Sequence, residues 1–187
     1  MRIPSAVLMG LSLLASPPAF SGYDETEWGM KREQVQKLYP GGTSKLYDSK
    51  DGRTSYDLQR EIVGYSALVQ FIFKPASGLY SVTVTFFPAG WKLRPDAPLL
   101  PPLKSSEAFP MVKKLRGALE IKYGTPVAAS PPPCKATKPM EHCSVMWRNP
   151  QGDLIALRNI SLGDGRYQVF VEYQSYADLE KESTKGL

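Results

Sequence analysis

The stretch that decides the fold is Leu79 to Phe87, LYSVTVTFF, in which apolar and polar side chains alternate. Val82, Val84 and Phe86 face one way, and hydroxyl side chains occupy the positions between them. Such alternation is typical of an antiparallel sheet with one face on a core and one face in water. The preceding stretch, Ala67 to Phe73, alternates in the same way. The sequence therefore predicts an antiparallel sheet around these two strands.

Helices and further strands are expected on both sides of this pair. Helical spacing predicts one helix over 30–39 and another over 106–123, each ended by Gly and Pro. The inner stripe of the second helix is expected to be Phe109, Val112, Leu115, Leu119 and Tyr123. The further strands are expected at 46–47, 54–63, 145–148, 153–160 and 166–174. This order predicts an α+β fold of two tandem helix-plus-antiparallel-sheet units, with the helices packed on one sheet face.

The N-terminus has the three-part layout of a secretory signal peptide. A positive charge at Arg2 precedes an apolar run from Ala6 to Ala15, and a small-x-small cleavage pattern ends at Ser21. The run is shorter than the roughly 20 residues that span a bilayer. No cysteine lies near the cut, so no lipid anchor is expected. We therefore expect a soluble periplasmic or secreted protein that begins at Gly22 and has no transmembrane segment.

The whole chain then divides into five parts. The expected parts are a signal peptide over 1–21, a first helix-plus-sheet unit over 22–87, a proline-rich connection over 88–105, a second unit over 106–175 and a polar tail over 176–187.

The charge pattern argues against nucleic acid as a partner. The net charge is only +5, and Lys and Arg are interspersed with Asp and Glu. A nucleic-acid-binding protein would carry a denser basic stripe. For an exported chain, the expected partner is a protein or another envelope macromolecule.

The segment Trp28 to Tyr39, WGMKREQVQKLY, resembles a pattern of small bacterial envelope proteins. In that pattern a Gly-Met pair opens a helix and a Val follows five residues after the Met. It occurs in the lipoprotein of the outer-membrane β-barrel assembly machinery and in the group that shares the fold of β-lactamase inhibitor protein. The resemblance implies short helices on one face of an antiparallel sheet. It also implies a protein-binding or envelope-maintenance role without catalysis, of the inhibitor or assembly-factor kind.

Cys134 and Cys143 are the only cysteines, and two interpretations of them stay open. In an oxidising compartment, a pair this close in sequence is most simply a disulfide that holds a loop. Alternatively, Cys134, Met140, His142 and Cys143 supply thiolate, thioether and imidazole, which together suit copper or zinc. This periplasmic metal-binding protein is the alternative to the partner-binding function.

No catalytic signature is present, so we expect neither enzymatic activity nor a cofactor. His142 is the only histidine, and the chain has no Gly-x-Ser-x-Gly elbow. Carboxylates are numerous, but nothing in their spacing singles out a pair.

The expected partner-binding residues are Trp91, Lys92 and Arg94 in the proline-rich connection. An exposed Trp beside two cations can anchor and steer an acidic partner. The other interpretation is that Trp91 folds back and shields a sheet face.

Overall fold

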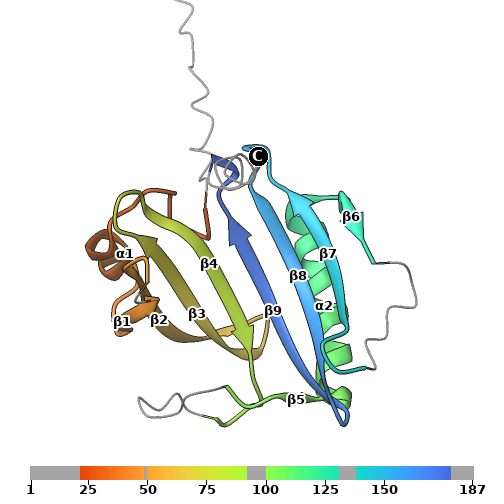
Figure 1. The fold of residues 1–187 in the computed structure, drawn as a ribbon. Helices are drawn as coiled ribbons and strands as arrows, with labels where there is room; N and C mark the ends of the chain where they lie inside the picture. Colours follow the sequence, from red (N-terminus) through yellow and green to blue (C-terminus); the bar gives the residue numbers. More distant parts are fainter. Residues whose placement is uncertain (1–21, 49, 92–99, 131–137, 178–187) are drawn as a thin grey trace, which may run out of the picture.

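A computed structural model describes residues 22–48, 50–91, 100–130 and 138–177 of the chain. In these residues, nine strands form one antiparallel sheet that packs with two helices (Figure 1). The helices are α1 (Arg32–Leu38) and α2 (Ser105–Tyr123). The strands are β1 (Thr43–Asp48), β2 (Arg53–Ile62), β3 (Tyr65–Lys74), β4 (Gly78–Phe86), β5 (Leu103–Lys104), β6 (Ala128–Ala129), β7 (His142–Arg148), β8 (Leu154–Gly163) and β9 (Arg166–Gln174).

The sheet is continuous through the middle of the molecule. Its strand order is β1-β2-β3-β4-β9-β8-β7-β6, and β5 pairs with β9 beside this path. At the centre, β4 and β9 pair from Ser81 opposite Gln174 to Phe86 opposite Val169. The prediction of two tandem helix-plus-sheet units with helices packed on one sheet face was therefore wrong. Alternation along a strand shows which side chains share a face, but not which strand supplies the next backbone hydrogen bonds.

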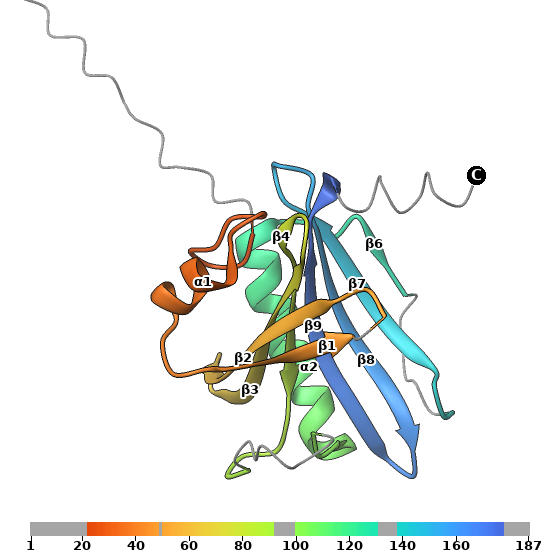
Figure 2. The same ribbon diagram turned by 60° about the vertical axis from the view of Figure 1, so that its left-hand side comes forward.

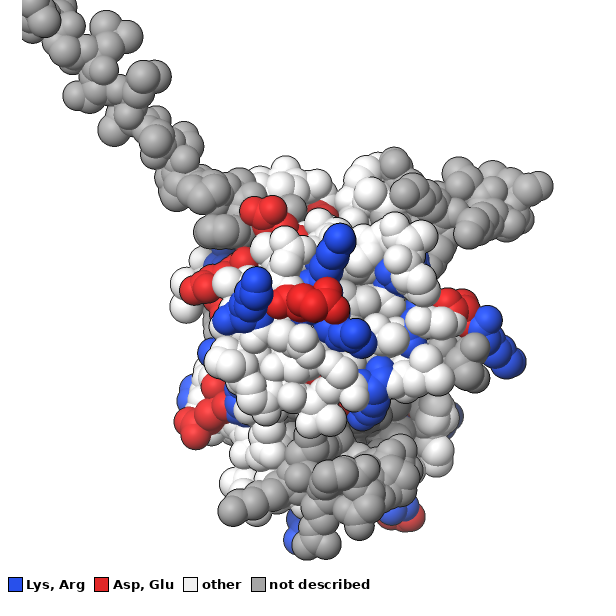
Figure 3. All heavy atoms as spheres, turned by 90° about the vertical axis from the view of Figure 1, so that its left-hand side faces the viewer, with Lys and Arg blue, Asp and Glu red and all other residues white. Residues whose placement is uncertain are grey.

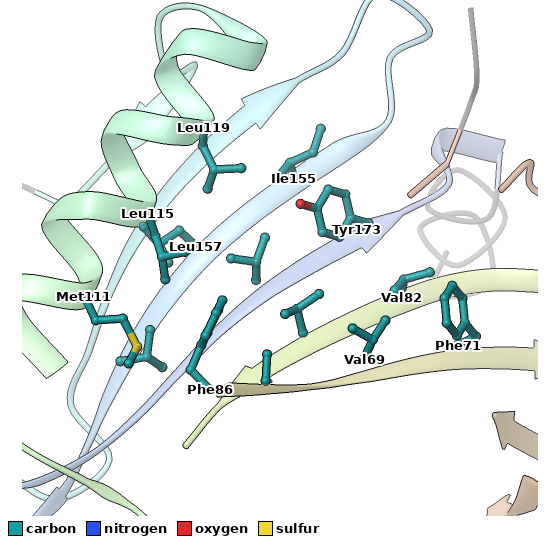
Figure 4. Close-up of a cluster of buried hydrophobic side chains, with 14 of the residues drawn as sticks. Val69, Phe71, Val82, Phe86, Met111, Leu115, Leu119, Ile155, Leu157 and Tyr173 are labelled. Atoms are coloured by element: carbon teal, nitrogen blue, oxygen red, sulfur yellow. The ribbon is translucent and has the colours of Figure 1, made fainter. Parts of the chain in front are cut away.

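The core is a hydrophobic cluster that joins residues of the sheet with residues of both helices. In β3 the predicted inner residues are almost completely buried, and Val69 and Phe71 have no exposed surface. Val82 and Val84 of β4 lie opposite Phe71 and Val69, so their side chains share the same layer. Figure 4 shows these residues beside the inner side chains of α2, β8 and β9. The alternation therefore predicts this part of the core correctly.

Helix α2 lies against β7, β8 and β9, as Figures 1 and 2 show. The residue before the first helical residue is Lys104, and its backbone N–H donates to Glu107 Oε2 at 2.9 Å. The inner stripe consists of Ala108, Met111, Leu115 and Leu119. Phe109 is 39% exposed, so the stripe begins one residue earlier than predicted.

The Trp28–Met30 segment clasps the start of β4. The backbone N–H of Gly29 donates to Leu79 O at 2.8 Å, and that of Leu79 donates to Met30 O at 2.9 Å. Gly78 has φ +73°, and a Cβ at this position would lie 2.4 Å from Gly29 O. Only glycine therefore fits this approach of two backbones. We call residues 28–30 with Gly78 and Leu79 the clasp.

The opposite face of the sheet is less exposed to solvent than the alternation of apolar and polar residues predicts. Ser81 and Thr85 are each only 6% exposed. On strand β2, which is separated from β4 by β3, Asp57 is 2% exposed, and its carboxylate pairs with Lys45 Nζ at 2.5 Å and accepts from Gln70 Nε2 at 3.3 Å. A buried carboxylate needs such partners, so this face contains a satisfied polar network.

Candidate binding cleft

An apolar cleft of about 370 Å³ opens between α2 and the end of the β2–β3 hairpin. This volume is at the lower end of the range for small-ligand sites. Its lining comes from five separate parts of the chain. The lining residues are Tyr23, Asp24, Arg60, Glu61, Ile62, Val63, Val84, Phe86, Leu115, Ala118, Leu119, Lys122, Val171 and Tyr173.

The floor of the cleft belongs to the core. Val84 and Phe86 of β4 are each 2% exposed, and Val171 of β9 is 3% exposed. Leu115 and Leu119 of α2 form one wall, and their side chains point toward Phe86 and Tyr173 (Figure 4). Because the sheet fixes the floor and the helix fixes the wall, the cleft is rigidly bounded on these two sides.

The rim on the hairpin side contains a strained residue. Val63 and Gly64 connect β2 to β3, and both have positive φ, +54° and +79°. A two-residue hairpin of type I′ needs this conformation, but a β-branched residue adopts it only at a cost of about 1–3 kcal/mol. Val63 is nonetheless 38% exposed, at the mouth of the cleft. A strained position therefore presents an apolar side chain to solvent.

Helix α2 also presents a large apolar side chain to solvent, outside the lining of the cleft. Ile121 is 90% exposed, the largest exposed fraction among the described large hydrophobic side chains. Lys114, Ala118 and Ile121 are spaced by four and three residues, so they share one face of α2. Lys114 Nζ lies 5.3 Å from the ring centroid of Tyr65, which begins β3. This face of α2 is therefore turned toward the hairpin and the cleft.

Tyrosines form the inner end of the cleft. The Tyr23 ring meets Tyr173 edge-on, with centroids 5.1 Å apart, and lies 6.0 Å from Phe71. Burial, reinforced by the Asp24 carboxylate, raises the pKa of Tyr23 to about 12. Burial also raises the pKa of Tyr173 well above its ordinary value, and its neighbours Tyr123 and Tyr23 add to this shift. Both phenols are therefore neutral at physiological pH and can donate hydrogen bonds.

Asp24 is engaged by residues beside the cleft. The Tyr39 hydroxyl donates to Asp24 Oδ2 at 3.0 Å, and Arg60 Nη1 lies 3.7 Å from the same oxygen. The Arg60 guanidinium also lies 5.1 Å from the Tyr39 ring centroid. Burial raises the pKa of Tyr39 to about 12. This group of three side chains is satisfied internally and holds the N-terminal segment against β2.

The lining of the cleft includes two cations, Arg60 and Lys122, and two carboxylates, Asp24 and Glu61. Arg60 and Ile62 point to the core side of β2, where Arg60 covers Tyr39, so Glu61 between them points to the other side. Lys122 lies 5.2 Å from the Tyr123 ring centroid and forms no ion pair with a described residue. Elsewhere, Lys and Arg are interspersed with Asp and Glu on the face in Figure 3. The cleft thus combines an apolar floor with one unpaired ammonium group.

The lining can bind but offers little for covalent chemistry. None of the fourteen described lining residues is a Ser, Thr, Cys or His. The phenols have pKa values raised away from neutrality, which makes them poor bases at pH 7. Asp24 already has two partners. The arrangement is therefore suited to holding an apolar group.

The predicted cysteine-loop residues lie elsewhere, at one end of β7. Met140 is 72% exposed, and His142 lies opposite Ile160 of β8. Cys143 is not a free thiol, whereas Cys134 falls outside the described residues. In the described ranges, no three His, Cys, Asp or Glu side chains are placed to hold a metal ion. The disulfide and the alternative metal site both stay predictions.

Of the three predicted partner-binding residues, only Trp91 is described. Its ring packs edge-on against Phe87, with centroids 5.1 Å apart. Its backbone oxygen accepts from Gln59 Nε2 at 3.2 Å, and its N–H donates to Pro88 O at 3.4 Å. Lys92 and Arg94 lie outside the described residues, as does the predicted signal peptide over 1–21. The partner surface around Trp91 therefore stays a prediction.

Sequence reasoning missed the cleft. Its lining residues come from positions as far apart as Tyr23 and Tyr173, so no motif contains them. One local signal was available, because Ile121 is a large apolar residue outside the predicted inner stripe of its helix. An apolar side chain on the polar side of a helix indicates an interaction surface.

No known family model, curated protein or solved structure matches this chain. Among the described residues, neither helix is long and apolar enough to cross a membrane.

Proposed function

We propose that this chain is an exported, non-enzymatic protein that binds another envelope macromolecule through the cleft between α2 and the β2–β3 hairpin. The observation that carries the proposal is the pairing of an apolar floor with a partly water-exposed apolar residue at the mouth, Val63. Exposed apolar groups around a concave site mark binding surfaces.

The strain at Val63 supports the same proposal. A glycine would satisfy φ +54° without penalty, yet this position holds a β-branched residue whose side chain is exposed. Val63 is still 38% exposed, so its burial in the fold is incomplete and offsets only part of this strain. Contact with a partner would offset it.

Site-specific photo-cross-linking tests the proposal. A photoreactive phenylalanine in place of Val63 should give one discrete adduct in the envelope of producing cells. The substitution Ala118→Trp fills the cleft from the α2 side and should abolish the adduct. Ala129→Trp, at an exposed alanine of β6, is the matched control and should leave it intact.

Two results would refute the proposal. One is the absence of any adduct from Val63 in cells that contain the folded protein. The other is an adduct that survives Ala118→Trp as well as it survives Ala129→Trp, since the partner would then touch Val63 without entering the cleft. Circular dichroism of both Trp variants confirms that each is folded.

A further inference from the structure

Strand β1 forms one end of the sheet, beside α1 (Figure 1). Its inner edge pairs with β2, from Thr43 opposite Asp57 to Leu46 opposite Thr54. Among the described residues, no strand pairs with its outer edge. Such an edge presents backbone N–H and C=O groups that can hydrogen-bond to another extended chain.

The two ends of the sheet differ in length and exposure. At the far end, β6 contains only Ala128 and Ala129, and an edge strand this short discourages further pairing. Strand β1 contains six residues, and none of them is Pro or Gly. Residues 43–47 are all exposed. Of the two end strands, β1 is therefore the longer one and the one more open to another strand.

The lysine of β1 does not protect its outer edge. A lysine on an edge strand usually discourages pairing, because its charge has to stay in water. Here Lys45 Nζ lies 2.5 Å from the carboxylate of Asp57 on β2, so the side chain extends over the sheet face and away from the outer edge. Asp57 also neutralises the charge. A strand can therefore pair beside β1 without breaking this ion pair.

The apolar side chains of β1 lack cover from the described residues. Leu46 is 61% exposed and Tyr47 is 46% exposed. Leu46 shares a face with Ser44, which lies opposite the core residue Tyr56. Leu46 thus extends the core-facing side of the sheet into solvent, where a strand added beside β1 would cover it.

The pattern of β1 fits a second copy of itself. Residues that lie opposite each other in an antiparallel pair share a face, so a two-fold axis perpendicular to the sheet has to pass through a residue. An axis at Lys45 would oppose two lysines, and an axis at Ser44 would leave Leu46 opposite Gly42. An axis at Leu46 brings the two Leu46 side chains together. It also places each Lys45 opposite Tyr47 of the other copy, so that no like charges are opposed.

We propose that this chain forms a symmetric dimer in which the β1 strands of two copies pair antiparallel about Leu46 and join the two sheets. The register of β1 on β2 shifts between Leu46 and Asp48, so the regular part of the new pairing is short. An interface built on so few residues is smaller than that of a stable complex. We therefore expect a reversible dimer with a Kd of roughly 10–100 µM.

Sedimentation velocity of the purified protein, from about 1 µM to about 1 mM, tests the proposal. The sedimentation coefficient should rise from that of a monomer to that of a dimer over this range. Leu46→Lys opposes two cations at the axis and should weaken the dimer by about tenfold or more. Ile121→Lys, at a side chain that is 90% exposed on α2, is the matched control and should leave the dimer unchanged. Both positions are exposed, and thermal melts confirm that both variants fold.

Cross-linking through single cysteines tests the position of the axis. In Leu46→Cys the two introduced thiols lie on directly opposite residues, with Cβ atoms about 5 Å apart. In Thr43→Cys each thiol lies three residues from the axis, so the two are about 20 Å apart. A short bismaleimide should therefore join copies of Leu46→Cys but not copies of Thr43→Cys. The unmodified protein is the control for the native cysteines.

Three results of these experiments would overturn the proposal. They are a chain that stays monomeric at about 1 mM, a dimer that Leu46→Lys and Ile121→Lys weaken equally, and equal cross-linking of the two Cys variants. A photoreactive phenylalanine at Leu46 that captures a different envelope protein, and no second copy, would also overturn it. The occupant of the edge would then be another extended chain.

The dimer and the binding cleft can fail separately. No residue of β1 is among the described residues that line the cleft. Leu46→Lys should therefore leave the Val63 adduct intact, and Ala118→Trp should leave the dimer intact.

Discussion

The clasp and the cleft flank the same sheet, and they use their space in opposite ways. At the clasp, two backbone hydrogen bonds join residues 28–30 to Leu79, and no room remains for a Cβ on Gly78. At the cleft, α2 and the β2–β3 hairpin leave about 370 Å³ open above buried side chains. At the clasp the backbone of the chain fills the junction, whereas at the cleft the space between α2 and the hairpin stays open. The difference separates residues that stabilise the fold from residues that are available for binding.

The largest effect is expected at the clasp. Gly78→Ala places a Cβ 2.4 Å from Gly29 O and 2.7 Å from Met30 O, at a φ of +73°. We expect a loss of at least about 3 kcal/mol in the free energy of unfolding, measured by urea denaturation. Gly165→Ala is the control, because its φ of +68° is similar but nothing lies within 4 Å of its Cβ. It should cost only about 1–2 kcal/mol; equal losses would show that the clasp is not tightly packed.

Two neighbouring residues of α2 sharpen the comparison. Leu119 is 7% exposed and Ile121 is 90% exposed. Leu119→Ala should cost about 2–4 kcal/mol, because it leaves a cavity in the core. Ile121→Ala should change stability by less than about 0.5 kcal/mol. Thermal melts of both variants check this. A large loss of stability in Ile121→Ala would show that its side chain is packed in the core.

Alkaline pH should lower the stability of the fold through Tyr23, which lines the inner end of the cleft. Burial raises the pKa of Tyr23 from 10.0 to about 12. The unfolded chain therefore loses this proton first, so the stabilisation is complete below pH 10 and is lost as the pH rises toward 12. Between pH 8 and pH 11 we expect Tyr23 to contribute about 1.4 kcal/mol of this loss. Urea denaturation at pH 8 and 11 measures it, and a Tyr23→Phe variant with an unchanged pH dependence would contradict the assignment.

The smallest expected effect is a gain in stability at the rim. Val63→Gly relieves a β-branched residue at φ +54°, and about a third of the Val63 side chain is already exposed. We expect the variant to be more stable by about 1 kcal/mol, although it should bind more weakly at the cleft. Paired melting and binding measurements check this trade-off. A less stable variant would mean that Val63 supports the hairpin.

Strands were predictable where one face is buried, as in β3 and β4. There the spacing of Val69, Phe71 and Phe73 at every second position indicates the core face directly. The sheet order was not predictable, because the β4–β9 pairing joins residues such as Val84 and Val171 that lie far apart in the sequence. The α2 stripe was misplaced at its start because Phe109 is apolar but exposed, while the smaller Ala108 is buried.

The candidate site was less predictable than the fold, for a physical reason. A cleft is the space that packing leaves unfilled, and that space depends on how α2 sits relative to the β2–β3 hairpin. Trp91 was predicted to bind a partner because a large aromatic side chain in a linker can anchor a binding partner. In the structure its ring packs on Phe87, and the exposed apolar side chain at the mouth of the cleft is Val63.

The central claim is that the partner binds at the cleft, and a cross-linking map tests it most directly. Photoreactive phenylalanine is placed in turn at Val63, at Trp91 and at Met140 of the cysteine loop, and adducts are compared in the same cells. The account predicts a discrete adduct from Val63 that disappears with Ala118→Trp. An adduct from Trp91 or Met140 that persists in the Ala118→Trp background, with none from Val63, would contradict it.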